Sequence, residues 1–382
     1  MNLAESLALL KNKIDQLSLN EDKGHLDHPE DMIFLGGSAG ANQALQAAIA
    51  TAKNPNTVTI KWDGYPALIF GRNNAGKFSI MDKHMFNKKD GTGRQVFSPQ
   101  QFVEYDKARG VERTSLWPII SAIWSGLEKA SAGSKGYYWG DLLFAQPLTV
   151  QNGSYVFKAN PNGITYHVDA NSELGKLIGG EQAGIAVHQY IDPNALSTDD
   201  AVTLNGTIGK LQNNSNVAIV PSKMPNTPKI KINSSLVKNV QNAISKYGRE
   251  VDEMMNNAPQ ARNTFNQLFT VYINKKIVAG DLNNLLAGFM QFVEGRPMTE
   301  RMKAKIIDYF QNNQEALAGA FTIWAEMYTL KMDIVSQLNK AAEASPVQGY
   351  LQDGTNTHEG FVANGLKFVD RMGFSRQNLA GR

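Results

Sequence analysis

The chain has 382 residues, of which 42% are apolar and 19% are charged, so it is ordinary globular material and exceeds the usual size of a single hydrophobic core. It contains no cysteine, which excludes disulfides, thiolate catalysis and Cys-ligated zinc or iron–sulfur sites. Its formal net charge of +3 is too small to indicate a nucleic-acid partner, because such proteins are recognised by clustered charge.

The first half of the chain predicts helices and then strands. Apolar residues at helical spacing predict amphipathic helices over 2–17 and 42–53. From Thr57 onward, short runs rich in Val, Ile, Tyr and Phe alternate with Gly, Asn and Asp, which is typical of antiparallel strands. The candidate strands are 57–61, 66–71, 76–81, 137–144, 154–158, 163–169, 184–190 and 216–220. We therefore expect a body built on sheets.

Two short motifs near the N-terminus have the composition of ligand sites. The glycine-rich run 36–40 lacks the lysine and the spacing of a Walker loop, so it favours a turn that starts a helix over a phosphate loop. His25, Asp27, His28 and Glu30 have the spacing of metal ligands, but no further cluster accompanies them. A structural or nucleotide-pocket role is favoured over zinc.

The second half of the chain is mainly helical. The helical period runs from about 233 to 343 with breaks near Pro259, Gly280 and Pro297, which predicts four or five packed helices. Strand-like residues return at 359–370, and Asn364-Gly365 between two apolar runs predicts a hairpin. Because strands resume after the helices, we expect a helical insert at 233–346 within a body formed by 1–232 and 347–382.

Five segments carry the chemistry, and they occur in a fixed order. The first is Lys61-Trp62-Asp63-Gly64 within 57–67, directly after a predicted strand. The others are the aromatic strand 137–143, the strand 163–169, His-Glu-Gly-Phe-Val at 358–362 and Leu-Lys-Phe at 366–368. In this order they resemble the motifs of the covalent nucleotidyltransferases, which comprise DNA ligases, RNA ligases and capping enzymes. Four runs look most like a phage-encoded branch of the ATP-dependent polynucleotide ligases: 61–67, Gly-Asp-Leu-Leu-Phe at 140–144, Asn-Pro-Asn-Gly-Ile at 160–164 and Glu-Gly-Phe-Val at 359–362.

The resemblance implies a role for each motif. Lys61 would be the nucleophile that carries AMP, while Glu359 and Lys367 would act with it at the α-phosphate. Asp141, which replaces the usual Glu, would hold the ribose hydroxyls. Tyr166 is the candidate for the ring that stacks on the purine, with Phe157 or Tyr155 as alternatives. The nucleotide-binding set is Thr59, Ile60, Asp63, Gly64, Arg72, Asp141, Tyr166 and Arg371, and the Mg²⁺ ligands are Glu359 and Asp63.

The amine of Lys61 must be neutral to attack the α-phosphate of ATP. A free lysine, with a pKa of roughly 10.4, is protonated at neutral pH. Burial, a nearby cation such as Lys367 and bound Mg²⁺ would all disfavour the ammonium form. Mg²⁺ would also neutralise charge that develops on the phosphate oxygens.

Some positions depart from the motifs of the family. Pro66 stands where an arginine is frequent, so Arg72 is the expected substitute, and Val369 stands at the second lysine of the fifth motif, where Arg371 would substitute. A strict hairpin at Asn364-Gly365 would place Glu359 and Lys367 on opposite faces. We therefore predict a bulge or bend at Gly360 that brings both toward ATP.

The resemblance predicts an α+β nucleotidyltransferase fold, the ATP-grasp-like adenylation fold of ligases, with twisted antiparallel sheets. Since only about eleven residues follow Arg371, we expect no OB domain. Nucleic acid would then contact the helical insert, the N-terminal region or the basic loop 72–94. The candidate contacts in this loop are Lys83, Lys88, Lys89 and Arg94.

The expected function is ATP- and Mg²⁺-dependent joining of 5′-phosphate and 3′-hydroxyl ends of DNA, with tolerance of RNA-containing strands. An RNA ligase is the alternative within the superfamily, and a non-catalytic phage nucleic-acid-binding protein on the same fold is the alternative outside enzymes. The apolar runs are shorter than the ~20 residues that span a bilayer, and the N-terminus lacks a signal pattern. We expect a monomer without membrane contact, in the cytoplasm of a phage-infected bacterial host.

Overall fold

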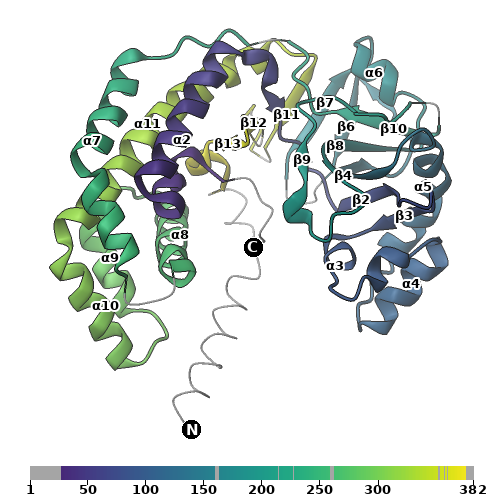
Figure 1. The fold of residues 1–382 in the computed structure, drawn as a ribbon. Coiled ribbons are helices and arrows are strands. Elements are labelled where there is room, and N and C mark those ends of the chain that lie inside the picture. The colour runs from purple at the N-terminus through teal and green to yellow at the C-terminus, as the bar shows by residue number, and fades with distance from the viewer. Residues whose placement is uncertain are drawn as a thin grey trace. The chain divides into compact units, whose positions relative to one another are not determined.

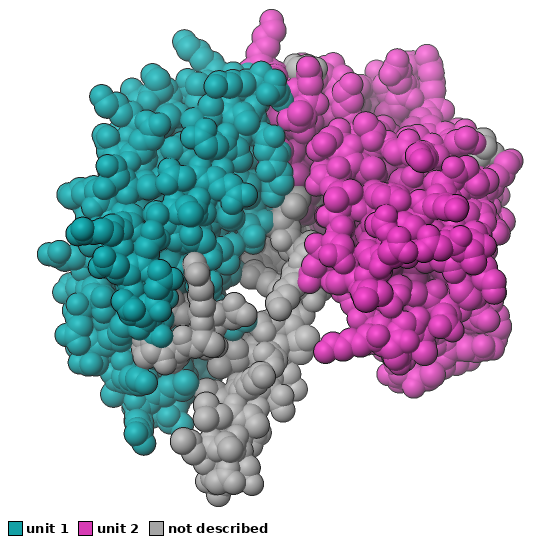
Figure 2. Space-filling model, viewed as in Figure 1, with its two compact units in different colours: residues 1–54, 230–336, 364–382 teal, residues 55–229, 337–363 magenta. Residues whose placement is uncertain are grey.

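A computed structural model describes residues 27–159, 163–213, 215–226, 228–258, 262–351, 353–356, 358 and 360–375. The chain divides into two compact units (Figure 2). Unit 1 consists of 1–54, 230–336 and 364–382, and unit 2 consists of 55–229 and 337–363. The helix expected at 2–17 lies outside the described residues.

Unit 1 is helical (Figure 1). It contains α2 (Met32–Lys53), α7 (Ser234–Asn256), α8 (Arg262–Ala279), α9 (Leu285–Glu294), α10 (Glu300–Asn312) and most of α11 (Gln314–Glu343). Among the described residues, five helices thus lie between 233 and 343, as predicted. Stacked and edge-on rings of Phe34, Phe269, Phe289 and Phe310 fill the centre of this unit. None of the described helices is both long and apolar enough to cross a membrane.

Helix α2 is kinked at Gly37, which has a φ of 62°. The backbone N–H and the hydroxyl of Ser38 both donate to the carboxylate of Asp252 in α7, over 2.7 and 2.5 Å. A Cβ atom at Gly37 would lie 2.2 Å from Asp252 Oδ1, so only glycine fits there. The glycine-rich run therefore lies at a kink inside α2, where Asp252 binds the backbone N–H and the hydroxyl of Ser38.

A buried cluster of charges joins three distant segments of unit 1. Glu30 in η1 (Pro29–Asp31) accepts from Lys331 in α11 over 2.7 Å. Asp31 accepts from Arg371 in η5 (Arg371–Ser375) over 2.9 Å and from the Trp324 indole over 2.9 Å. Burial lowers the pKa of Lys331, although the charge of Glu30 opposes this effect. This cluster explains why both ends of the described chain group with the helices, whereas the predicted division assigned them to the sheet-containing body.

Unit 2 contains two sheets, and a third sheet of order β1-β12-β13 has its strand β13 in unit 1. The larger sheet has the strand order β10-β8-β4-β2-β3, with β9 paired to β8, and the smaller one has the order β11-β7-β6-β5. Their bounds are β2 (Ala67–Arg72), β3 (Phe78–Met81), β4 (Gly136–Phe144), β5 (Val150–Gln151), β6 (Ser154–Lys158), β7 (Thr165–Asp169), β8 (Ala183–Ile191), β9 (Val202–Thr203), β10 (Val217–Pro221) and β11 (Val347–Tyr350). The predicted strands and the α+β character are confirmed. One pairing differs from the antiparallel expectation, because β10 runs parallel to β8.

The segment between β3 and β4 holds helices that the sequence pattern did not reveal. They are α3 (Lys83–Phe86), α4 (Pro99–Ala108) and α5 (Leu116–Ala130), and α6 (Glu173–Ile178) follows β7. The expected basic loop 72–94 is therefore not one loop, because it includes β3, α3 and η3 (Thr92–Gln95). Helix α5 packs against β2, β3 and β10.

The predicted hairpin at Asn364-Gly365 is confirmed. These residues have φ values of 50° and 76°, as a two-residue turn between strands requires. They join β12 (Phe361–Ala363) to β13 (Leu366–Phe368). Gly360, where a bulge or bend was expected, has a φ of 154°, a conformation that favours glycine. The pairing of β12 with β1 (Thr59–Ile60) shows no register shift, so the irregular backbone lies at the entry to β12 and not within it.

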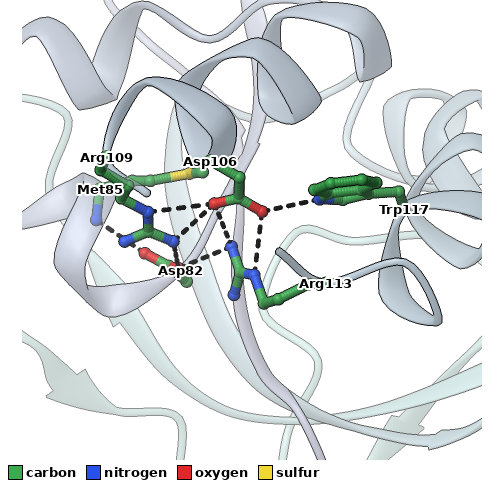
Figure 3. Close-up of polar contacts among 6 residues, drawn as sticks. All are labelled: Asp82, Met85, Asp106, Arg109, Arg113 and Trp117. Atoms are coloured by element: carbon green, nitrogen blue, oxygen red, sulfur yellow. Dashed lines mark hydrogen bonds and ion pairs between the residues drawn. The ribbon is translucent and has the colours of Figure 1, made fainter. Parts of the chain in front are cut away.

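A charged network ties α4 to its surroundings (Figure 3). Asp106 accepts hydrogen bonds from Arg109 over 2.6 Å, from Arg113 over 2.6 Å and from the Trp117 indole over 2.9 Å. Asp82 accepts from Arg109 as well, over 2.6 Å. Burial raises the pKa of Asp106, but the hydrogen bonds from Arg113, Trp117 and Arg109 outweigh it, so the pKa lies below its ordinary value. The carboxylate is therefore stabilised in its charged form.

Replacing Asp106 with Asn should lower the free energy of unfolding by about 3–5 kcal/mol, because two arginines lose a buried counter-charge. Since the folded pKa is depressed, this stabilisation is complete above about pH 3.9 and is lost as the pH falls through the folded pKa. Urea unfolding between pH 2 and 7 should therefore show a weaker loss of stability in acid for Asp106→Asn than for wild type. Glu104→Gln, an exposed change in the same helix, is the matched control. Equal acid dependence of wild type and Asp106→Asn would contradict this role.

Candidate active site

Lys61 lies at the end of β1, where the backbone is paired on both sides. Its N–H donates to the carbonyl of Gly360 over 2.9 Å, which continues the antiparallel pairing of Ile60 with Phe361. The N–H of Ile60 donates to the carbonyl of Ser222 over 2.7 Å. The side chain of Lys61 is half-buried. The strand thus fixes the backbone from which Lys61 projects.

Asp63 anchors the loop that follows Lys61. It is 8% exposed, and its Oδ2 accepts from the N–H of Ile164 over 3.0 Å. Its own N–H donates to the hydroxyl of Tyr166 in β7 over 2.7 Å. The ring of Tyr166 is fully buried and contacts the rings of Trp62 and Phe157 at centroid distances of 4.8 and 5.5 Å. Asp63 therefore ties the lysine loop to the smaller sheet.

Gly64 and Tyr65 fasten the same loop to the larger sheet. A Cβ atom at Gly64 would lie 2.5 Å from the Cβ of Asp141 in β4, so the loop passes too close to that strand for any side chain. The N–H of Tyr65 donates to the carbonyl of Leu142 over 3.0 Å, and the N–H of Leu142 donates to the carbonyl of Pro66 over 3.1 Å. The ring of Tyr65 stays 65% exposed. A rigid backbone thus presents an aromatic ring to solvent.

Asp141 faces His188 of β8. His188 Nε2 and Asp141 Oδ2 are 3.3 Å apart, and both side chains are partly exposed. The imidazole also contacts the ring of Trp139, at a centroid distance of 5.9 Å, and the amine of Lys83 lies over that ring at 5.6 Å. Polar and aromatic groups therefore gather on β4 and β8 where the lysine loop contacts Asp141.

Four of the five motif segments thus meet within unit 2. The loop 61–66 contacts 360 through Lys61, 164–166 through Asp63, and 141–142 through Gly64 and Tyr65. A family model matches residues 22–382. The chain belongs to the DUF6267 family, a family of unknown function. No curated protein and no solved structure matches it.

Two of the nucleotide-binding residues expected in this DUF6267 chain are held elsewhere. Arg72 lies at the end of β2 remote from the lysine loop, and its guanidinium donates to the carbonyls of Gly76 and Glu128, both over 2.9 Å. Arg371 belongs to the buried charge cluster of unit 1. Neither arginine is brought to Lys61 by the contacts that assemble the site.

The remaining expected phosphate and metal groups are Lys367, Glu359 and Asp63. Lys367 belongs to unit 1, where its N–H donates to the carbonyl of Asp27, and Glu359 is outside the described residues. The described part of the chain holds no group of three or more His, Asp or Glu side chains that could bind a metal ion. Asp63 uses one carboxylate oxygen for Ile164. A metal site made of protein groups alone is therefore not formed by the described residues.

The four candidate nucleic-acid contacts of this DUF6267 chain differ in their surroundings. Arg94 donates to the carbonyls of Phe86 and Leu196, over 2.6 and 3.2 Å. Lys88 is paired with Asp90 over 3.3 Å, while Lys83 covers Trp139. Lys89 is exposed. The geometry therefore gives Arg94 a structural contact and leaves Lys89 the most accessible cation of the four.

Sequence reasoning missed two residues at the site. Tyr65 lies inside the first motif, and its place in a Gly-Tyr-Pro turn is the signal for an exposed ring. His188 lies in a predicted strand, where no pattern shows that it faces Asp141. The fully buried Tyr166, by contrast, was singled out as a purine-stacking ring, and the structure places it under the lysine loop as an anchor.

Tyr166→Phe should lower the free energy of unfolding by about 1–3 kcal/mol, because the buried N–H of Asp63 loses its acceptor while the ring packing is kept. Urea unfolding measures the change. Tyr155→Phe in the adjacent strand β6 is the matched control, since its hydroxyl has no hydrogen-bond partner within the described part of the chain. Equal stability of the two variants would contradict the anchoring role of Tyr166.

Proposed function

We propose that this protein is an ATP-dependent DNA ligase that joins 5′-phosphate to 3′-hydroxyl ends through a lysyl-AMP intermediate on Lys61. One observation carries the proposal. Four segments that resemble nucleotidyltransferase motifs, and that are spread over 300 residues of sequence, are joined by hydrogen bonds and close contacts around Lys61. Such convergence is expected if the segments form one site, and it is not expected of unrelated chance matches.

The proposed joining reaction has three steps. The neutral amine of Lys61 attacks the α-phosphorus of ATP, the bond to the β-phosphate oxygen breaks, and pyrophosphate leaves with the lysine bound to AMP. An oxygen of a 5′-phosphate end then displaces Lys61 and takes the AMP. Finally a 3′-hydroxyl attacks that 5′-phosphorus, so that AMP leaves and a phosphodiester forms. The pairing of Lys61 with Gly360 supports the first step, because it fixes the backbone from which the attacking amine projects.

Mg²⁺ would act mainly on the phosphates of ATP. This ion commonly retains waters and binds substrate phosphates with one or two carboxylates, which suits a site where Asp63 already serves Ile164. Asp63 and Glu359 are the proposed protein ligands. When bound, the ion supplies charge neutralisation at the phosphate oxygens.

A polynucleotide substrate is supported by aromatic and basic groups of unit 2. The exposed ring of Tyr65 is attached to a backbone fixed to β4, and aromatic rings of this kind stack with nucleic-acid bases. Lys83, Lys88 and Lys89 lie in or directly after α3 of the same unit. Together they offer the stacking and the positive charge that a nucleic-acid strand requires.

Incubation with α-labelled ATP and Mg²⁺ should label the wild-type chain covalently, and Lys61→Ala should lose the label by more than about a hundredfold, because the attacking amine is absent. Denaturing gel electrophoresis measures the label. Lys158→Ala, an exposed lysine change in β6, should leave labelling at the wild-type level. Labelling of both variants alike would contradict the assignment of Lys61, and labelling by GTP in place of ATP would favour a capping-type activity.

The substrate is tested with nicked duplexes in all four combinations of DNA and RNA strands. Sealing of DNA nicks at the highest rate supports the DNA ligase, whereas sealing confined to RNA ends favours the RNA ligase. A chain that takes the label and seals none of them would be no ligase of nicked duplexes. Absence of both label and sealing favours the non-catalytic binding protein.

Lys89→Ala should make nick sealing less sensitive to salt. Each phosphate that a lysine neutralises adds roughly 0.9 to the slope of log affinity against log salt, so the slope should fall by about that amount. Sealing rates at subsaturating DNA between 50 and 200 mM salt measure it. Lys129→Ala, an exposed lysine change in α5, is the control, and an unchanged slope in Lys89→Ala would remove this residue from the nucleic-acid surface.

A further inference from the structure

His188 is the extra residue of a β-bulge. Along the pairing of β4 with β8, Trp139 is opposite Gln189 and Gly140 is opposite Val187, so His188 has no partner in register. A Cβ atom at Gly140 would lie 2.4 Å from the carbonyl oxygen of Ala186. Glycine at 140 is therefore what allows the two strands to approach so closely next to the bulge, and bulges of this kind redirect a side chain.

The redirected imidazole meets the carboxylate that follows Gly140. His188 Nε2 lies 3.3 Å from Asp141 Oδ2, and the two side chains are 33% and 22% exposed, respectively. The ring of His188 is held from another side by Trp139. Asp141 Oδ1 accepts no hydrogen bond from the described residues. One carboxylate oxygen thus lies against the imidazole, and the carboxylate as a whole remains partly exposed.

We propose, on the basis of the proposed function, that His188 is a positioning residue that holds Asp141 toward the ribose hydroxyls of ATP. A carboxylate on a two-bond side chain at a strand surface can rotate, and the imidazole 3.3 Å from Oδ2 limits that freedom. Oδ2 faces His188 Nε2 at 3.3 Å, and Oδ1 accepts from a ribose hydroxyl of the bound nucleotide. The covalent nucleotidyltransferases usually have a glutamate at this position, whose longer side chain reaches the ribose. Here the shorter Asp141 is held in place by His188, so that it points toward the ribose before the nucleotide binds.

The role is tested with ATP and 2′-deoxy-ATP in the covalent labelling reaction. The full-length wild-type chain should prefer ATP on the order of tenfold in kcat/KM, the value of one good hydrogen bond. His188→Ala should abolish most of that preference, with the loss in KM, because the ribose contact is made in ground state and transition state alike. His188→Gln should restore part of it, because an amide N–H can also donate to Asp141.

A double-variant comparison separates positioning from general damage. Asp141→Asn should lose the preference as His188→Ala does, and the combined variant should lose no more than either alone, because the two residues act as one unit. His84→Ala, an exposed histidine change in α3, is the control and should keep the wild-type preference. Additive losses in the combined variant, or a full ATP preference in His188→Ala, would overturn the proposal.

Equilibrium binding of both nucleotides with Mg²⁺, measured by calorimetry, distinguishes the two proposals. A wild-type chain that takes no label but binds ATP with a preference that depends on His188 would refute the ligase function and uphold the positioning role. A chain that takes the label with no dependence on His188 would uphold the ligase function and refute the positioning role. A chain that binds neither nucleotide would overturn both proposals.

Discussion

The site depends on the way Asp63 is bound. Its buried carboxylate accepts the N–H of Ile164 and its own N–H donates to Tyr166, so a loop of few residues is tied to a strand a hundred positions away. Since a buried polar group without a partner is costly, these two bonds oblige β7 and the lysine loop to stay together. The position of Lys61 follows from that constraint and from its pairing with Gly360.

Two glycines make the same arrangement sterically possible. Gly64 lets the loop touch Asp141, and Gly140 lets β4 and β8 close up beside the bulge. Both glycines lie inside the motifs that the sequence singled out, so the motifs contain packing requirements as well as reacting groups. A K-x-D-G segment thus specifies a close approach to a neighbouring strand, and an accidental match on an open surface would not need its glycine.

Much of the fold follows from local pattern. The strands around 67–72 and 136–144 and the helices after 233 were predicted because alternation and helical period are strong there. The helices α4 and α5 were missed, and so were the ends of unit 1. The placement of those ends depends on the ion pair of Asp31 with Arg371, which lies 340 positions away and which no spacing in the sequence reveals. Whether two opposite charges are buried together depends on the tertiary structure, so it cannot be predicted from local sequence pattern.

The candidate site, like the fold, could be predicted only in part from the sequence. Lys61, Asp63 and Asp141 could be named from the sequence, because a motif states residue type and order. A motif does not state which atoms already pack against or hydrogen-bond with the rest of the protein. Tyr166 has the residue type of a stacking ring, yet its ring packs against Trp62 and its hydroxyl accepts from the N–H of Asp63. His188 shows the converse, because a bulge that shifts one strand by one residue decides where its imidazole points. Register, more than residue type, separates the anchors of this site from the groups that remain available to a ligand.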